Sequence, residues 1–137
     1  MTPDNLGVRL GSRPRRLLAG DLACYLVATI LGFATHQELA LSASERFLAT
    51  WLPFSAAWLL VAPAMGVYAG GEEVEWRHLA RAAWASVISA PLGGVLRAVW
   101  LGGAVVPVFV LVMVGVTTGL VLAWRLAEVL LLRKAKV

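Results

Sequence analysis

The sequence predicts an all-α integral membrane protein, a bundle of four transmembrane helices with both termini in the cytoplasm. The chain of 137 residues is 60% hydrophobic and only 15% charged, whereas a typical soluble domain is about 25% charged. Its apolar residues form four long runs, and a bilayer core of roughly 30 Å is crossed by ~20 helical residues. The charged residues gather at the ends of those runs, as they do in membrane proteins.

The last apolar run gives the clearest signal. Residues 105–132 read VVPVFVLVMVGVTTGLVLAWRLAEVLLL, and no charged side chain occurs over 105–124. Pro107 stands near the start, where a missing amide hydrogen matters least. Trp124 and Arg125 then place an amphipathic ring and a charge at an expected membrane interface. A soluble chain of this length could not bury such a segment on every side, so the run predicts a transmembrane helix.

Three further spans precede it. The expected helices cover residues 17–35, 47–69, 79–101 and 105–132, and they form a single membrane domain over 1–137 with basic tails at 1–16 and 133–137. In the second span, Trp51 and Tyr68 are expected to anchor the two interfaces. The first span is longer than the ~7–15 residues of a signal-peptide core, and no clear cleavage site follows it, so we expect it to be retained.

The basic residues are divided unevenly between the two sides of the predicted bundle. Four spans place both termini and the second loop on one side, and only Arg46 and Arg97 on the other. The positive-inside rule therefore predicts cytoplasmic termini in a multi-pass protein of the plasma membrane. The net charge of +4 reflects this topology, and nucleic acid is not an expected partner. The basic residues of the cytoplasmic side are Arg9, Arg13, Arg15, Arg16, Arg77, Arg81, Arg125, Arg133, Lys134 and Lys136.

Prolines and glycines inside the spans predict bends and close helix contacts. Pro63 lies in the second span, and Pro91, Gly93 and Gly94 weaken the third span near its middle. Broken helices line substrate sites in some transporters, which makes this stretch the best candidate for a functional bend. The simpler interpretation is a packing kink that admits a close neighbour. Small residues at helical spacing are candidate helix-packing positions, namely Gly20, Gly32, Gly66, Gly115 and Gly119.

The motifs of soluble enzymes do not occur in this sequence. It contains no HExxH, no glycine-rich phosphate loop, no nucleophile elbow and no cysteine pair, since Cys24 is the single cysteine. The two histidines, His36 and His78, are expected on opposite sides of the membrane, so they cannot share a metal ion. We therefore expect a protein without enzymatic activity, bound metal or cofactor.

The remaining candidates for chemistry are ionisable residues near membrane depth, which are expensive to place there. Four of them are expected near the inner boundary, where Asp21 would pair with Arg81 or Arg125. Two are expected near the outer boundary. The six candidate polar membrane sites are Asp21, His36, Arg81, Arg97, Arg125 and Glu128.

Two interpretations of these charges are open. In the first, they serve the passage of an anion or small solute, with Arg97 gathering it outside and the Asp21 cluster gating it inside. In the second, the charges extend to the interfaces and lock the helices together. Neither interpretation requires a charge at the centre of the bilayer.

Several of these positions together resemble a known family. The chain is similar to an uncharacterised family of small prokaryotic membrane proteins with four helices, domain of unknown function 3054, over about residues 18–126. The resemblance implies the four-helix fold and brings no activity with it. Its motifs are Asp21 opening the first span, Gly32 and His36 closing it, Trp58, Pro63, Gly66 and Tyr68 in the second, Pro91, Gly93, Leu96 and Arg97 in the third, and Thr118, Gly119, Trp124 and Arg125 in the last.

Two functions from different classes follow. The first is a small-solute or ion transporter, or a channel-like protein, that acts as a homodimer and associates through Gly115 and Gly119 or through the stripe from Gly20 to Gly32. The alternative is a non-catalytic structural or accessory subunit that packs against a larger membrane complex. The expected partners are thus the lipid bilayer and either a second copy of this chain or a larger assembly.

Overall fold

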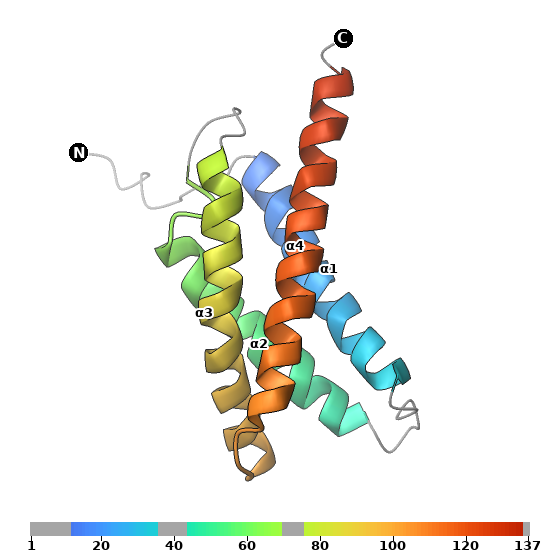
Figure 1. Ribbon diagram of the computed structural model, residues 1–137, viewed down its shortest axis with the longest axis vertical. Helices are drawn as coiled ribbons and strands as arrows, with labels where there is room; N and C mark the ends of the chain where they lie inside the picture. The colour runs from blue at the N-terminus through green and yellow to red at the C-terminus, as the bar shows by residue number, and fades with distance from the viewer. Residues whose placement is uncertain (1–11, 36–43, 70–75, 136–137) are drawn as a thin grey trace, which may run out of the picture.

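A computed structural model describes residues 12–35, 44–69 and 76–135 of the protein. These residues form four helices, α1 (Ser12–Thr35), α2 (Ser44–Ala64), α3 (Trp76–Leu101) and α4 (Pro107–Ala135), and no strand occurs among them (Figure 1). At 1.5 Å per residue the helices are roughly 32 to 44 Å long, and each contains a segment long and apolar enough to cross a membrane. The predicted all-α class with four candidate spans is confirmed for the described part of the chain.

The helices do not pack equally along their lengths. α3 lies against α2 and α4, while α1 packs on α4 and α2. Near the beginning of α1, Asp21 contacts Arg125 and the Cys24 thiol reaches the Leu120 carbonyl at 3.5 Å. Figure 1 shows α1 and α4 diverging from this end toward the end of α1. α1 and α4 are therefore in close contact near the beginning of α1 and separate toward its end.

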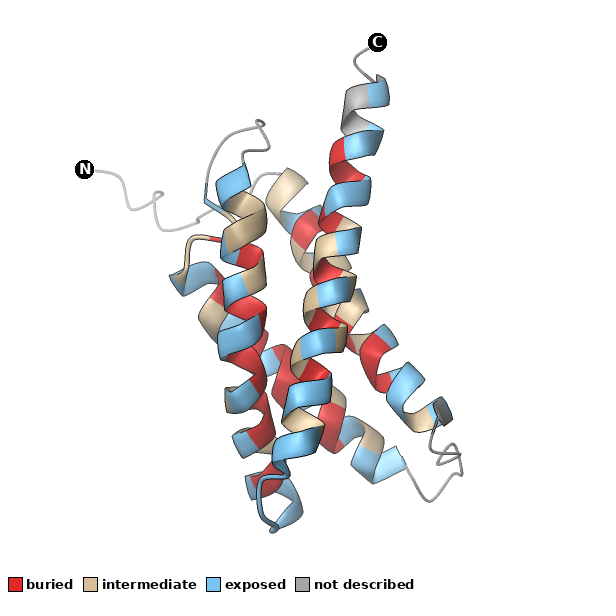
Figure 2. Ribbon diagram, in the orientation of Figure 1, coloured by how far each residue is buried: buried red, intermediate tan, exposed pale blue. Residues whose placement is uncertain are grey.

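The core combines large aromatic rings with very small residues. Tyr25, Phe54 and Trp58 are fully buried, and the Tyr25 and Trp58 ring centroids lie 5.6 Å apart. A Cβ atom at Gly93 would lie 2.7 Å from Phe54 Cδ1, and one at Gly94 would lie 2.6 Å from a Val110 methyl. Figure 2 shows the buried positions on the inward faces of the helices, with exposed residues on their outer faces. Glycine thus lets α3 approach α2 and α4 at the depth of the rings.

The stretch around Pro91 does not interrupt α3, which is helical from Trp76 to Leu101. Pro91 is exposed on the outer surface, while Gly93 and Gly94 are buried. The helix is therefore unbroken at this stretch, and a functional bend there stays a prediction. Gly93 and Gly94 lie against Phe54 and Val110, so these two glycines admit close neighbours.

The second helix ends earlier than expected, at Ala64 rather than at residue 69. Pro63 consequently lies in its last turn and not inside a long span. Gly66 has a positive φ of 67° and turns the chain, with its amide donating to the Pro63 carbonyl at 3.0 Å. Glycine adopts this left-handed conformation without steric cost. The assignment of Gly66 as a helix-packing residue is thus wrong, because it terminates the helix.

Candidate functional site

A buried ion pair joins α1 to α4. Asp21 is 0% exposed and Arg125 is 4% exposed. The Arg125 guanidinium donates from Nη2 to Asp21 Oδ2 at 2.5 Å and from Nε to Oδ1 at 3.3 Å. This two-point geometry matches the planar fork of arginine to the two oxygens of a carboxylate. Of the two partners expected for Asp21, the structure has Arg125, whereas the exposed Arg81 donates to the Gly66 carbonyl at 3.3 Å.

A hydrogen-bonded chain from α2 and its following turn completes this site. The Tyr68 hydroxyl donates to Asp21 Oδ2 at 2.6 Å, and Trp58 Nε1 donates to the Tyr68 oxygen at 2.8 Å. The Arg125 guanidinium also lies 5.4 Å from the centre of the Tyr68 ring. Burial raises the pKa of the Tyr68 phenol, and the negative charge of Asp21 raises it further. The phenol therefore keeps its proton and remains a donor.

This position of Tyr68 differs from the expected one. A tyrosine near the end of a span is expected to anchor the interface, but early termination of α2 turns Tyr68 into the bundle. Arg125 is likewise buried, at 4% exposed, where it contacts Asp21 of α1, and α4 continues beyond it to Ala135. We call Asp21, Arg125, Tyr68 and Trp58 the inner cluster.

A second ion pair lies beside the inner cluster. Arg16 Nη2 is 2.7 Å from Glu128 Oε1, with the Arg16 side chain half exposed and that of Glu128 almost fully buried. Since Arg125 and Glu128 lie three residues apart on α4, α4 presents one positive and one negative side chain to α1. The charges expected near the inner boundary thus connect α1 to α4 twice.

Neutral polar groups continue from the inner cluster into the middle of the bundle. The hydroxyls of Tyr25 and Ser89 are 3.0 Å apart and both residues are fully buried. Thr29 donates to the Tyr25 carbonyl at 2.9 Å, and Thr117 donates to the Met113 carbonyl at 2.6 Å. Sequence reasoning missed these residues, because single hydroxyls in an apolar span carry no charge signal. The three-residue spacing of Ser86 and Ser89 on one face of α3 was the one indication.

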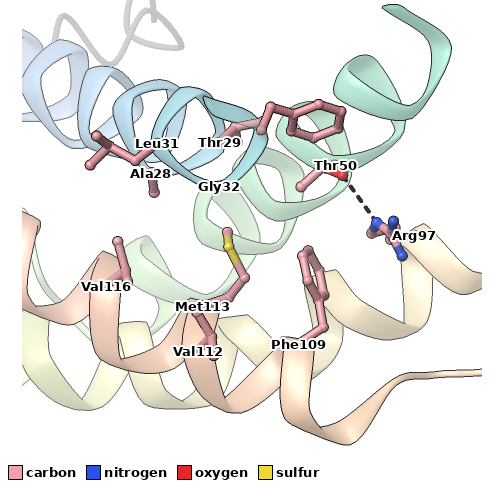
Figure 3. Close-up of a pocket in the computed structure, with 11 residues that line it drawn as sticks. Ala28, Thr29, Leu31, Gly32, Thr50, Arg97, Phe109, Val112, Met113 and Val116 are labelled. Carbon is pink, nitrogen blue, oxygen red and sulfur yellow. Dashed lines mark hydrogen bonds between the residues drawn. The ribbon is translucent and has the colours of Figure 1, made fainter. Parts of the chain in front are cut away.

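A cavity of about 410 Å³ lies in the other half of the bundle, within the range of roughly 300–1,000 Å³ that small-molecule sites occupy. Figure 3 shows aliphatic side chains at one end of it and Arg97 with Thr50 at the other. All four helices contribute to its wall. The lining residues are Ala28, Thr29, Leu31, Gly32, Phe33, Thr50, Arg97, Phe109, Val112, Met113 and Val116.

Thr50 and Phe109 both contact Arg97 at its end of the cavity. Its Nε donates to Thr50 Oγ1 at 3.0 Å, and the Thr50 hydroxyl donates in turn to the Arg46 carbonyl at 2.9 Å. The Arg97 guanidinium carbon lies 4.5 Å from the centre of the Phe109 ring, a distance at which a cation is attracted to the ring face. His36, expected near Arg97, lies outside the described residues.

The glycines expected to pack helices behave differently from one another. A Cβ atom at Gly20 would collide with the Trp124 ring, so this glycine lets α1 and α4 meet. Trp124 is accordingly partly buried against α1 and is not a simple interfacial ring. At Gly32, Gly115 and Gly119, an added Cβ atom would meet nothing within 4 Å among the residues that the structure describes. Gly32 lines the cavity, and Gly115 and Gly119 lie on an exposed face of α4.

Four helices that are each long and apolar enough to cross a membrane, with a buried ion pair among them, are compatible with a multi-pass, all-α membrane protein. Comparison with known families matches residues 18–128 to the family described as Protein of unknown function (DUF3054), and the chain belongs to this family. The resemblance inferred from the sequence is confirmed, and the match includes both the inner cluster and the cavity. Comparisons with curated proteins and with solved structures gave no match.

Proposed function

We propose that this protein transports a small anionic solute across the membrane, as a homodimer with cytoplasmic termini. The observation that supports the proposal most directly is the cavity with Arg97 at one end, in a bundle whose opposite end holds the buried inner cluster. Such a cavity would accept the solute from the outer side. The inner cluster would then be the gate through which it leaves.

The two polar sites lie at opposite ends of the bundle. Asp21 is near the beginning of α1, and Arg97 is near the end of α3. Since α1 and α3 cross in the same direction in a bundle of four sequential spans, these positions face opposite sides of a membrane. Between them the buried rings of Tyr25, Phe54 and Trp58 fill the interior. A cavity at one end and a buried ion pair at the other are the arrangement expected of an alternating-access transporter in one of its states.

The inner cluster has the properties of a gate. It links α1 to α4 beside Gly20, where the Trp124 ring packs closely on α1, through a pair that is satisfied by groups of the chain itself. Separation of α1 from α4 would have to break the pair. It would also break the neighbouring pair of Arg16 and Glu128, whose arginine is already half exposed, so that water could reach Glu128. A buried ion pair that can be opened is a common element of conformational switches.

The exposed face of α4 supports the homodimer. Gly115, Gly119, Ala123 and Ala127 follow one another at four-residue spacing, and all four are exposed. Small residues at this spacing let two transmembrane helices approach closely. A unit of only four helices has little room for an enclosed pathway, and a second copy would supply an additional wall.

Uptake into proteoliposomes tests the proposal. Radiolabelled methanesulfonate and octanesulfonate are suitable probes, because a sulfonate keeps its charge and crosses lipid slowly. Wild-type protein should accelerate the uptake of at least one of them, and Arg97→Gln and Asp21→Asn should each abolish the increase. Arg77→Gln removes an exposed arginine from the first turn of α3 and is the matched control. Absence of any protein-dependent uptake, or equal uptake by all variants, would refute the transporter.

The same α4 face favours a second candidate, an accessory subunit of a larger membrane complex. In that case the exposed small residues of α4, from Gly115 to Ala127, would meet a helix of a different protein. Purification from native membranes in mild detergent separates the two candidates. A dimer of this chain alone contradicts the subunit hypothesis, whereas a stoichiometric larger assembly supports it.

A further inference from the structure

The cavity opens sideways, between α1 and α4. At the tight end, Gly20 accepts the Trp124 ring and Cys24 reaches the Leu120 carbonyl. Farther along α1, Gly32 lines the cavity, and no described residue comes within 4 Å of a Cβ atom built there. The lining residues Leu31 and Val112 are 48% and 55% exposed. Exposed lining residues thus belong to both α1 and α4, so we take the cavity to open on this flank, where the two helices diverge in Figure 1.

This flank would face hydrocarbon and not water. The opening lies on spans α1 and α4, which have no charged side chain over residues 22–34 and 107–124. A solute that enters through it comes from the acyl-chain region of the bilayer. A fully hydrated small anion would have to leave water to take this route, and it would leave the aliphatic walls unfilled.

We propose that the cavity binds an anionic single-chain amphiphile, which enters laterally from the bilayer. Its chain would lie along the aliphatic wall of Ala28, Leu31, Val112 and Val116, and its head group would meet Arg97. This inference rests on the proposed function in one respect, because it names the substrate class of the same cavity. A volume of about 410 Å³ is near the lower end of the usual range for ligand sites, which suits one hydrocarbon chain rather than two.

The charged end of the cavity is built for an oxyanion head group. Thr50 already donates its proton to the Arg46 carbonyl, so its oxygen acts as an acceptor and fixes Arg97 Nε. Phe109 holds the guanidinium from the other side. An arginine fork oriented in this way matches the oxygens of a carboxylate, sulfonate or phosphate. The sequence from aliphatic wall to fixed cation, seen in Figure 3, follows the order of groups in such an amphiphile.

Photolabelling of the full-length protein in nanodiscs tests this inference. The probe is a twelve-carbon alkyl sulfonate with a diazirine in the middle of its chain, and mass spectrometry locates the labelled residues. Label should map to lining residues of α1 and α4. Arg97→Gln should weaken specific labelling about tenfold or more, since a hydrogen bond to a charged group is lost. Arg77→Gln should label like the wild type.

A second pair of variants tests occupancy of the cavity without changing charge. Gly32→Leu places a large side chain where a Cβ meets nothing, and leucine is a better helix former than glycine. It should therefore fold and exclude the probe. Ala23→Leu adds the same kind of side chain at an exposed position of α1 outside the cavity and should leave labelling unchanged. Equal labelling of Gly32→Leu and wild type would overturn the proposal.

Competition experiments distinguish the possible sources of the anion. Unlabelled dodecanesulfonate should displace the probe, whereas methanesulfonate and the two-chain lipid phosphatidylglycerol at the same concentration should not. Displacement by methanesulfonate would show a site for free anions, and displacement by phosphatidylglycerol would show a lipid head-group site. Either result overturns the single-chain assignment. Site-specific labelling without any uptake would contradict the proposed transporter alone, whereas methanesulfonate uptake without labelling would contradict this inference alone.

Discussion

Replacing Asp21 with asparagine keeps the size of the side chain but removes the charge that neutralises Arg125. The guanidinium would remain 4% exposed in the bundle, and arginine cannot discard its proton. Breaking a buried pair on one side typically costs about 3–5 kcal/mol. For Asp21→Asn we expect a cost at the lower end of this range, because Glu128 lies three residues from Arg125 and its negative charge can partly replace that of Asp21. We expect Asp21→Asn to lower the unfolding free energy by about 3 kcal/mol.

The reciprocal variant should cost less. Arg125→Gln leaves a buried carboxyl group that can become neutral by taking up a proton, and the Tyr68 hydroxyl still donates to it. The double variant Asp21→Asn/Arg125→Gln leaves neither charge unpaired. Its loss of unfolding free energy should therefore be smaller than the sum of the losses in the two single variants. The difference, which is the coupling energy, should be about 1–3 kcal/mol.

The measurement is equilibrium unfolding in dodecyl maltoside micelles with increasing sodium dodecyl sulfate, followed by tryptophan fluorescence and far-ultraviolet circular dichroism. Arg15→Gln is the control, since Arg15 is exposed on the same helix. Additive single effects, or an Asp21→Asn effect no larger than that of Arg15→Gln, would refute the inference that this ion pair stabilises the contact between α1 and α4.

Three other predictions use the same unfolding assay or its dimer equivalent. Gly20→Ala should destabilise the bundle by about 1–3 kcal/mol, because the added Cβ overpacks the Trp124 ring. Tyr68→Phe should cost about 1–3 kcal/mol, since it removes a hydroxyl that joins Trp58 to Asp21. Burial raises the pKa of Tyr68, so the folded state holds this proton more tightly than the unfolded state does. The protonated phenol therefore contributes its full stabilisation of the fold below roughly pH 10. This contribution is lost as the pH rises further. Tyr68→Phe should therefore reduce the alkaline loss of stability, and an unchanged alkaline profile would contradict that cause. Gly119→Leu should leave the unfolding free energy nearly unchanged but lower Förster transfer between labelled copies in liposomes, and undiminished transfer would exclude this face of α4 from the dimer.

The spans were predictable because their signal is summed over many residues. Each helix contains a run too apolar and too long for the surface of a small soluble protein, and all four appear in the structure. The end of α2 was not predictable in the same way. Residues 65–69 remain apolar after Ala64, so hydropathy continues while the backbone turns at Gly66. A positive φ is a local backbone property that composition does not report.

From the sequence, Asp21 could be predicted to form an ion pair, but its partner could only be narrowed to Arg81 or Arg125. Membrane depth places Asp21 near both Arg81 and Arg125, and the decision depends on which faces of α1, α3 and α4 meet. The structure resolves it through Gly20, which allows α4 to approach α1 beside Asp21. The part played by Tyr68 could not be inferred, because it follows from the unexpected end of α2. The cavity likewise depends on the divergence of helices, which leaves no signal in the sequence.

The small-residue stripe of α1 shows how one sequence pattern produces two different surfaces. Gly20 and Gly32 belong to the same stripe, but the first is filled by Trp124 and the second lines an open cavity. Two straight helices that cross at an angle can be in close contact only near their crossing point. Contact at Gly20 thus requires a gap farther along α1, unless a large side chain fills it, and the stripe places glycine and alanine there instead. The closure of the bundle at the inner cluster and its opening at Arg97 are therefore consequences of a single helix crossing.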